Sequence, residues 1–323
     1  MKIMKDGLKK RNKISLFLDS GAFSAWTQGR EIDIDAYIQF CLEHQDLVDA
    51  VANLDVIPGH PYKRITQKDI EDSAKRGWEN YEKMLAAGIP KNKLVHIFHQ
   101  GEDMKWLEKM VRVMPYIGLS PANDKTRDQK LMWLDRCMEC VTDKNGMPLV
   151  KFHGFAVTSL DMLLRYPWYS VDSSTWVVNA RMGRVFIPRR KDGQWKYDEK
   201  FWIIPVSNRS PEKKEAGKHI DNISPMQRRM VLEYIHEMGY SLGKSRFEKV
   251  LQSHELKENE RWAEKKPKDK TEKRLLEVIE EPGLCNKYEL RDEINIMFFQ
   301  GLEKSLPKWP WPFKRKSSRG FLL

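Results

Sequence analysis

The sequence has few cysteines and no long apolar run, and each absence excludes a class of protein. Four cysteines in 323 residues, at positions 41, 137, 140 and 285, are too few and too scattered for a disulfide framework, so we expect a reducing compartment. No stretch approaches the length of a membrane span, and no apolar segment follows the charged amino terminus MKIMKDGLKKRNK to make a signal peptide. We therefore expect a cytoplasmic protein without a membrane association, in the host cytoplasm if a phage encodes it.

Acidic residues are outnumbered by basic ones. Fifty-seven Lys and Arg against 46 Asp and Glu give a formal charge of +11, which favours a polyanionic partner such as nucleic acid. Charge alone leaves a merely basic enzyme equally well supported. With 41% apolar and 11% aromatic residues, the chain can bury one substantial core.

Short apolar segments alternate with amphipathic segments through the first half of the chain. The apolar segments contain β-branched and aromatic residues, which indicates strands at residues 15–19, 48–56, 94–100, 116–120, 150–157 and 169–173. The segments between them carry apolar residues three and four positions apart, which predicts helices at residues 35–45, 67–87, 102–113, 125–142 and 159–165. This alternation is typical of a parallel sheet.

Six such units fit either a doubly wound sheet or three quarters of an eight-stranded barrel. The length of the chain favours the barrel, so we expect an α/β fold with a TIM-type (β/α)8 barrel over residues 1–250. Residues 201–206, FWIIPV, are the candidate seventh strand. In residues 185–195, Asp192-Gly193 lies between extended segments and predicts a hairpin insertion after the sixth strand.

The composition changes beyond residue 250, and we expect residues 251–323 to form a basic C-terminal extension. Residues 257–274 are almost wholly charged, which is typical of a solvated helix or linker. The chain then ends in a segment that combines aromatic rings with cations, namely Trp309, Trp311, Lys314, Arg315 and Lys316. Such a segment is suited to stacking on bases and meeting phosphates, and packing of the tryptophans on the barrel fits equally well.

Three of the predicted strands end in an aspartate followed by a turn. They are Asp19 in LFLDSGAFS, Asp55 in NLDVIPG and Asp172 in YSVDSST. Strand carboxyl ends surround the mouth of a barrel, so we expect the three carboxylates to converge on one face. A single aspartate at a strand end is more often a helix cap or turn former, so function and structure are equally supported by the three together.

Paired carboxylates suit chemistry at an anomeric carbon. One attacks to form a covalent glycosyl intermediate, and the other handles protons on the leaving and entering groups. At a nucleoside C1′, this double displacement retains configuration and lets a second base replace the first. After Asp19, the small residues Ser20 and Gly21 leave room for a flat ligand on which Phe23 can stack; alternatively, Gly21 shapes a tight turn and Phe23 enters the core.

Taken in order, these motifs resemble the tRNA-guanine transglycosylase superfamily, and within it the phage enzymes that insert 7-deazaguanines into DNA, the DpdA group. The resemblance extends from about Leu16 to Gly183 and depends on motif order more than on overall identity. It is carried by Asp19-Ser20-Gly21-Ala22-Phe23, Asp55, His99-Gln100-Gly101, Tyr116-Ile117-Gly118-Leu119-Ser120, Phe152-His153-Gly154-Phe155-Ala156, Tyr169-Ser170-Val171-Asp172-Ser173 and Asn179-Ala180-Arg181-Met182-Gly183-Arg184.

The resemblance implies a role for each of these positions. Asp172 is expected to be the covalent nucleophile and Asp19 the general acid/base. Ser20 and Phe23 are expected to contact the base, Phe23 by stacking. Asp55 is expected to read the guanine edge, because N1–H and the exocyclic amine are two adjacent donors.

The remaining substrate contacts come from three strand ends. The resemblance implies that Gln100 meets the guanine carbonyl edge and that backbone groups of Gly118 and Leu119 contact the heterocycle. His153 and Gly154 stand where the family has a methionine-glycine segment that closes over the base. A hydrogen-bonded structural role is the commoner one for such a histidine, and stacking on the base or donating to it is the alternative.

Two arginines follow the nucleophile motif. Arg181 and Arg184 are expected to meet the phosphates that flank the reacting nucleotide, because a guanidinium binds a phosphate in a bidentate manner. Ordinary surface charge explains them equally well.

The sequence departs from the family at the structural zinc of the tRNA enzymes. Three closely spaced cysteines and a histidine hold that metal, whereas this chain has only Cys285 in the region. Cys137 and Cys140 have a CxxC spacing but lie in a helical segment without a second ligand pair, so we interpret them as ordinary helix residues. We expect no metal and no cofactor, and the departure leaves tRNA binding and the oligomeric state open.

The expected function is that of a pentosyltransferase that replaces guanine in DNA by a free 7-deazaguanine base of the preQ0 type, with retention. The target nucleotide must be single-stranded or flipped out, because a paired base hinders access to C1′. The same exchange on tRNA is the alternative. A nucleic-acid-binding barrel without catalysis has no reason to keep both Asp19 and Asp172, and a carbohydrate hydrolase has no use for the Asp55 and Gln100 pair.

Overall fold

The computed structural model describes residues 15–60, 63–157, 159–269 and 271–315, and these form two compact units. One unit comprises the described residues up to Ser173 together with those from Pro307 onward, and the other comprises Ser174–Leu306. The sequence predicted a domain boundary at residue 250. That residue is the last one of strand β11 (Lys244–Val250) and lies inside the second unit.

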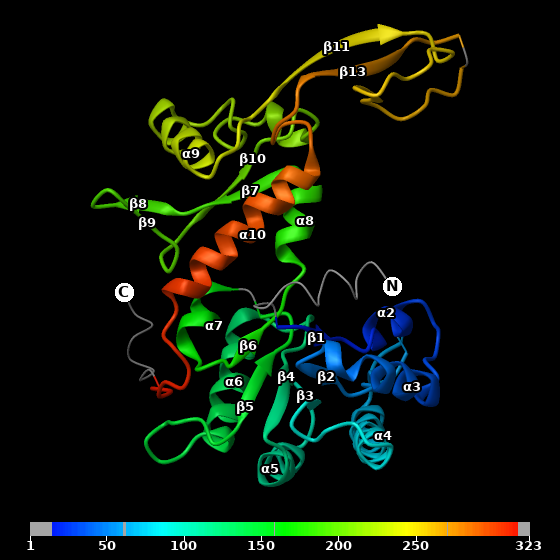
Figure 1. Ribbon diagram of the computed structural model, residues 1–323, viewed down its shortest axis with the longest axis vertical. Coiled ribbons are helices and arrows are strands. Elements are labelled where there is room, and N and C mark those ends of the chain that lie inside the picture. Colours follow the sequence, from blue (N-terminus) through cyan, green and yellow to red (C-terminus); the bar gives the residue numbers. More distant parts are fainter. Residues whose placement is uncertain (1–14, 61–62, 158, 270, 316–323) are drawn as a thin grey trace. The chain divides into compact units, whose positions relative to one another are not determined.

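Six parallel strands form the sheet of the first unit, and they lie in the order in which they occur along the chain (Figure 1). They are β1 (Phe17–Leu18), β2 (Ala50–Ala52), β3 (Leu94–His99), β4 (Tyr116–Ser120), β5 (Lys151–Gly154) and β6 (Ser170–Val171). All six predicted strands and their parallel arrangement are confirmed. An order without a reversal excludes the doubly wound alternative, in which the strand order reverses at a switch point.

The sheet is curled, so that its first strand lies across from later ones. The ring of Phe17 in β1 stacks on that of His153 in β5 with centroids 4.5 Å apart, and meets the ring of Tyr116 in β4 edge-on at 6.3 Å. A complete eight-stranded barrel is not confirmed, because the parallel sheet of the described residues has six strands. The expected seventh strand is present as β10 (Trp202–Pro205), but it pairs antiparallel with β7 (Arg184–Ile187) in the second unit.

Helices connect the strands of the first unit. They are α2 (Ala22–Thr27), α3 (Ile34–His44), the 3₁₀ turn η1 (Gln45–Leu47), α4 (Gln67–Ala86), α5 (Met104–Val113), α6 (Arg127–Val141) and α7 (Leu160–Arg165). The longer ones begin at residues suited to capping: Thr66 and Asp69 form a capping box at α4, and Thr126 and Gln129 form one at α6. All five predicted helices are confirmed as α3 to α7.

The C-terminal segment packs on the first unit, to which it belongs. The ring of Phe313 stacks on that of Tyr166 at 5.7 Å, and the Phe313 N–H donates to the carbonyl of Gly146 at 2.8 Å. The ring of Trp309 meets that of Tyr169 edge-on at 5.1 Å. Of the two interpretations of this segment, packing on the first unit is observed for Trp309, at its surface residue Tyr169, and the interpretation as a nucleic-acid contact stays a prediction; Lys316 lies outside the described residues.

The second unit combines antiparallel strands with helices. It contains α8 (Thr175–Arg181), β7, β8 (Arg189–Lys191), β9 (Gln194–Lys196), β10, the 3₁₀ turn η2 (Pro211–Lys214), α9 (Pro225–Glu237), β11, β12 (Glu260–Trp262), β13 (Arg274–Glu281) and α10 (Tyr288–Ser305). Its core includes Val185, Ile187, Ile204, Tyr234 and Ile294. Ile204 and Val206 of the expected seventh strand are buried in this core, and this explains why the segment does not extend the parallel sheet.

Two sequence predictions concern turns and strands of the second unit. The hairpin is confirmed as β8–β9, and both Asp192 and Gly193 have positive φ, 50° and 76°, as a type I′ turn requires. The prediction of a solvated helix or linker at residues 257–274 is wrong, because this region contains β12, which pairs with β13. Nε of Arg261 in β12 donates to Oε2 of the fully buried Glu277 in β13 at 2.8 Å. At least one charged residue of this region therefore has an ion-pair partner on the neighbouring strand.

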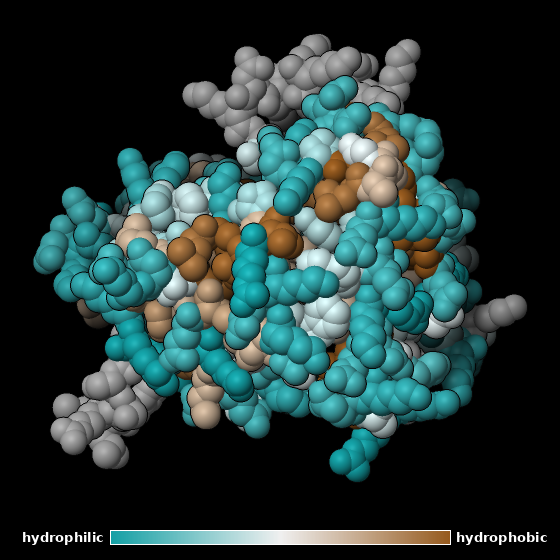
Figure 2. Space-filling view, turned by 90° about the horizontal axis from the view of Figure 1, so that it is seen from below, coloured by the Kyte–Doolittle hydropathy of each residue, from teal (hydrophilic) through white to brown (hydrophobic). Residues whose placement is uncertain are grey.

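No helix in the described part of the chain combines the length and the apolar character needed to cross a bilayer. The face shown in Figure 2 is largely hydrophilic, and its apolar side chains lie in separate patches. Scattered apolar patches of this kind are ordinary on protein surfaces and indicate no partner by themselves.

Candidate active site

The three predicted aspartates come together at one end of the parallel sheet. Asp19 follows β1, Asp55 follows β2 and Asp172 follows β6. Desolvation is the main cause that raises the pKa of Asp19, and the negative charges of Asp172 and Asp55 add to it, so both carboxylates lie near enough to act on Asp19. The curl of the sheet accounts for this proximity, because β1 and β6 are its two edge strands and would otherwise lie far apart.

Asp172 is held as an anion. Its Oδ1 accepts the backbone N–H of Ala156 at 2.9 Å and faces Nε2 of His153 at 3.3 Å. Partial burial acts to raise the pKa of Asp172, but the hydrogen bonds from His153 and Ala156 outweigh it and place the pKa below the ordinary value of 3.8. The side chain remains 57% exposed, as a nucleophile needs to be.

Asp19 is shifted in the opposite direction. Asp19 is exposed by its surface area, but the protein around its carboxyl partly desolvates it and raises the pKa above 3.8; repulsion from Asp172 and Asp55 adds to this, although the backbone N–H groups of Ser20 and Gly21 favour the anion. Two nearby carboxyls whose environments move their pKa values apart are suited to different tasks, one as proton carrier and one as nucleophile.

A partly buried hydrogen-bonded chain lies behind Asp172. Nδ1 of His153 is 2.7 Å from Oγ of Ser170, which is 2.5 Å from the hydroxyl of Tyr116. His153 is 3% exposed, so it does not line the open surface of the site. Sequence reasoning named His153 but missed Ser170 and the Tyr116 hydroxyl. Ser170 lies two residues before Asp172, on the same face of its strand, and this spacing was the available signal.

The segment after β5 adopts an unusual backbone conformation. Ala156 has φ 54°, in the left-handed region that a non-glycine residue seldom adopts, and its N–H is the one donated to Asp172. Strained backbone of this kind often lies at functional sites, where the surrounding structure holds it. No sequence signal identified this donor.

Asp55 is held by a histidine that lies between two carboxylates. Nε2 of His99 is 2.8 Å from Oδ2 of Asp55, and its Nδ1 is 3.1 Å from Oε1 of Glu102. Burial acts to lower the pKa of His99, but Asp55 and Glu102 outweigh it and raise that pKa well above 6.5. A cationic His99 therefore fixes one oxygen of Asp55, and sequence reasoning had assigned no role to Glu102.

Gln100 is bonded within the protein at both ends of its amide. Its Oε1 accepts the backbone N–H of Ala122 at 3.1 Å, and its Nε2 donates to the carbonyl of Gln129 at 3.2 Å. In this conformation Gln100 anchors the segment between β4 and α6, and one N–H and one lone pair of its amide are used within the protein.

The predicted glycine contacts lie beneath side chains. A Cβ at Gly118 would lie 2.6 Å from Cε2 of Phe155, so this ring covers the Gly118 position. A Cβ at Gly154 would lie 2.9 Å from Val157 and 3.0 Å from the ring of Trp168. Leu119 is fully buried. These residues are explained by packing, and Phe155 would have to move before a base could contact Gly118.

The turn after Asp19 presents an exposed ring. Gly21 has φ 73° and begins α2, and the hydroxyl of the buried Ser20 accepts the Ala22 N–H at 3.3 Å. Phe23 is 54% exposed, so the alternative in which it enters the core is wrong. An exposed ring beside Asp19 remains available for stacking.

The two predicted phosphate contacts lie in the second unit. Arg184 forms a bidentate pair with Glu212, with Nη2 to Oε1 at 2.8 Å and Nε to Oε2 at 3.2 Å. Glu212 therefore occupies the two donor groups of Arg184 that would bind a phosphate in a bidentate manner. Arg181, at the end of α8, is exposed.

The cysteines are structural in their surroundings. Cys137 and Cys140 lie in α6 as expected, and the buried Cys285 accepts a hydrogen bond from Nδ2 of Asn208 at 3.1 Å. Among the described residues, no group of three or more His, Cys, Asp or Glu is arranged to hold a metal ion.

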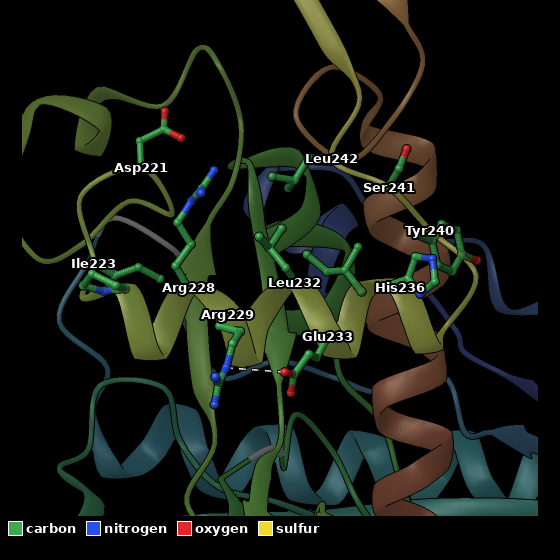
Figure 3. Close-up of a pocket in the computed structure, with 12 residues that line it drawn as sticks. Asp221, Ile223, Arg228, Arg229, Leu232, Glu233, His236, Tyr240, Ser241 and Leu242 are labelled. Carbon is green, nitrogen blue, oxygen red and sulfur yellow. Dashed lines mark ion pairs between the residues drawn. The ribbon is translucent and has the colours of Figure 1, made fainter.

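A cavity of about 960 Å³ lies in the second unit, along one side of α9 (Figure 3). Leu232 and Leu242 line it together with the charged side chains of Arg228, Arg229 and Glu233, of which the last two form an ion pair at 3.5 Å. None of the residues selected from the sequence lines this cavity.

Comparison with known proteins gave no match to a protein-family model, a curated protein or a solved structure. The site is therefore interpreted from its own geometry. That geometry offers an exposed anionic carboxylate, a second carboxyl with a raised pKa and a third one fixed by an imidazolium.

Proposed function

We propose that this protein is a pentosyltransferase that exchanges a purine base at a nucleoside C1′, with Asp172 as the nucleophile and Asp19 as the general acid/base. The observation that carries the proposal is the opposite perturbation of these two neighbouring carboxyls. The roles follow from the directions of the two shifts, because the attacking group must be ionised and the carboxyl with the raised pKa is the better proton donor of the two.

The reaction has two balanced steps. A carboxylate oxygen of Asp172 forms a bond to C1′ as the bond from C1′ to the base nitrogen breaks, and the departing base takes a proton from Asp19. The incoming base then gives a proton to Asp19 and attacks C1′, which releases Asp172 as a carboxylate. Two inversions retain the configuration of the sugar.

A nucleic acid supplies the nucleoside in this proposal. The formal charge of +11 favours a polyanion, and we propose DNA with a single-stranded or flipped-out guanine, replaced by a free 7-deazaguanine of the preQ0 type. Exchange on tRNA is the alternative and uses the same residues. The barrel fold of the family that the sequence resembles is part of this proposal. Both proposed catalytic residues, Asp19 and Asp172, directly follow strands of the six-stranded parallel sheet.

Base recognition is assigned to Asp55 and Phe23. His99 fixes Asp55 through Oδ2, and a carboxylate in this position suits acceptance from the two adjacent donors of a guanine edge. The exposed Phe23 supplies a stacking surface. Gln100 and the Gly118 backbone are given a supporting role, because their bonds and packing are internal to the protein.

Incorporation of labelled base tests the proposal. The protein is incubated with labelled guanine or preQ0 and, in separate reactions, single-stranded DNA, duplex DNA, tRNA or an oligosaccharide. We expect incorporation into DNA, abolished by Asp172→Asn and Asp19→Asn and retained by Asp72→Asn, a change at an exposed position of α4 in the same unit. Incorporation into tRNA alone supports the alternative, and hydrolysis of the oligosaccharide without any incorporation rejects base exchange.

A further inference from the structure

The roles proposed so far for Asp172 and Asp19 do not account for the hydrogen-bonded side chains next to Asp172. We infer that Tyr116, Ser170 and His153 form a positioning relay that presents the Nε2–H of His153 to Oδ1 of Asp172 and so orients the nucleophile. This inference rests on the proposed role of Asp172. The relay itself is defined by three consecutive contacts, of 2.5, 2.7 and 3.3 Å.

The direction of the hydrogen bonds follows from Asp172, which is held as a carboxylate and can only accept. Nε2 of His153 faces Oδ1 of Asp172 at 3.3 Å, so in a neutral imidazole Nε2 carries the proton and Nδ1 accepts. The hydroxyl of Ser170 must then donate to Nδ1, and the hydroxyl of Tyr116 donates to Oγ of Ser170.

Packing holds the imidazole in place. One face of the His153 ring stacks on Phe17 at 4.5 Å, and Phe155 meets it edge-on at 4.5 Å. With 3% of its surface exposed, His153 is unsuited to stacking on a base, which answers the question left open by the sequence. His153 is therefore a positioning residue rather than a catalytic one.

The packing around His153 also links the strand of Asp19 to the strand end of Asp172. Phe17, which packs on His153, lies two residues before Asp19 on the same strand end. The titratable groups next to the relay include Asp172, which faces His153, and Tyr169, whose ring meets that of Tyr116 edge-on at 5.4 Å, and the charge of Asp172 acts in turn on Asp19. A change at His153 therefore alters the orientation of the nucleophile without removing either carboxyl.

Activity of a matched variant series gives the first readout. His153→Leu removes the donor, His153→Gln keeps an amide N–H that can reach Asp172, and Ser170→Ala removes the bond that fixes the imidazole. We expect kcat to fall by about 10- to 100-fold in His153→Leu, the size of a lost hydrogen bond to a charged group, and to recover substantially in His153→Gln. We also expect the acid limb of the pH profile of kcat/KM to move to higher pH in His153→Leu and to return in His153→Gln. Equal losses in the two His153 variants, with unchanged pH profiles, would overturn the relay.

The imidazole tautomer gives a second readout that does not depend on base exchange. The protein is labelled with ¹⁵N-histidine, and the His153 resonances are assigned by their loss in His153→Gln. At pH 8 we expect the Nε2–H tautomer in the wild type and a mixture of tautomers in Ser170→Ala. An Nδ1–H tautomer in the wild type contradicts the relay. Because this measurement needs no substrate, failure of base exchange with the expected tautomer rejects the proposed function and leaves the relay intact as a structural device.

Discussion

Asparagine at Asp19 and at Asp172 is expected to change stability in opposite directions. Asp172→Asn keeps an oxygen that can accept from Ala156 and His153 but removes the charge that strengthens both bonds. Hydrogen bonds to charged groups contribute about 1.5–3 kcal/mol against about 1 kcal/mol for neutral pairs, and the 57% exposure of Asp172 reduces the difference, so we expect a loss of about 1 kcal/mol. For a unit of this size, the melting temperature then falls by about 2–4 °C.

Asp19→Asn removes a carboxyl that the fold disfavours as an anion, so we expect the melting temperature at pH 8 to rise. Its pKa is raised in the folded state, and its cost is therefore present at pH 8 and disappears as the pH falls through the raised pKa towards 3.8. The pKa of Asp172 is lowered, so its contribution is present above 3.8 and is lost as the pH falls below that value. Both differences from wild type should thus shrink on acidification.

Thermal unfolding followed by circular dichroism between pH 3 and pH 8 measures these shifts, with Asp72→Asn on the exposed side of α4 as the matched control. We expect the control to move the melting temperature by no more than about 2 °C at any pH, and by a similar amount across the pH range. A lower melting temperature for Asp19→Asn at pH 8, or a higher one for Asp172→Asn, would refute the division of roles between the two carboxyls.

Two further predictions concern the walls of the site. His99→Gln should destabilise the protein more at pH 6 than at alkaline pH. The raised pKa of His99 means that its stabilising ion pairs with Asp55 and Glu102 are fully formed below pH 6.5 and are lost as the pH rises through the raised pKa. Chemical denaturation at several pH values measures this, and a loss of stability that does not depend on pH would contradict it. Gly118→Ala should cost about 1–3 kcal/mol because the new Cβ meets the ring of Phe155, and Phe155→Leu in the same chain should recover part of that loss; strict additivity in the double-mutant cycle would show that the two positions do not touch.

The parallel sheet could be predicted from the sequence because its signals are local. Alternating apolar runs and amphipathic segments located all six strands and the helices between them. Closure of the barrel could not be predicted in this way, because an apolar run such as residues 201–206 does not specify which surface buries it. Ile204 and Val206 of this run belong to the core cluster of the second unit that also contains Ile294, about 90 positions further along the chain.

In the candidate site, too, local features could be predicted from the sequence and contacts between distant residues could not. The three aspartates were found because each ends a strand, and strand ends of a parallel sheet meet at one edge. The partners of Gln100 were not foreseeable, since Ala122 and Gln129 are brought to it by the packing of α6. Phe155, which covers Gly118, likewise has no signal in the sequence.

Covalent trapping tests the division of labour at the site most directly. Wild-type protein is incubated without an incoming base with a single-stranded oligonucleotide that contains one guanine, quenched under denaturing conditions and digested, and the adduct is located by mass spectrometry. The account predicts that the oligonucleotide, having lost guanine, is attached through Asp172, and that Asp172→Asn forms no adduct. Attachment at Asp19 or Asp55, or an adduct that persists in Asp172→Asn, would contradict it.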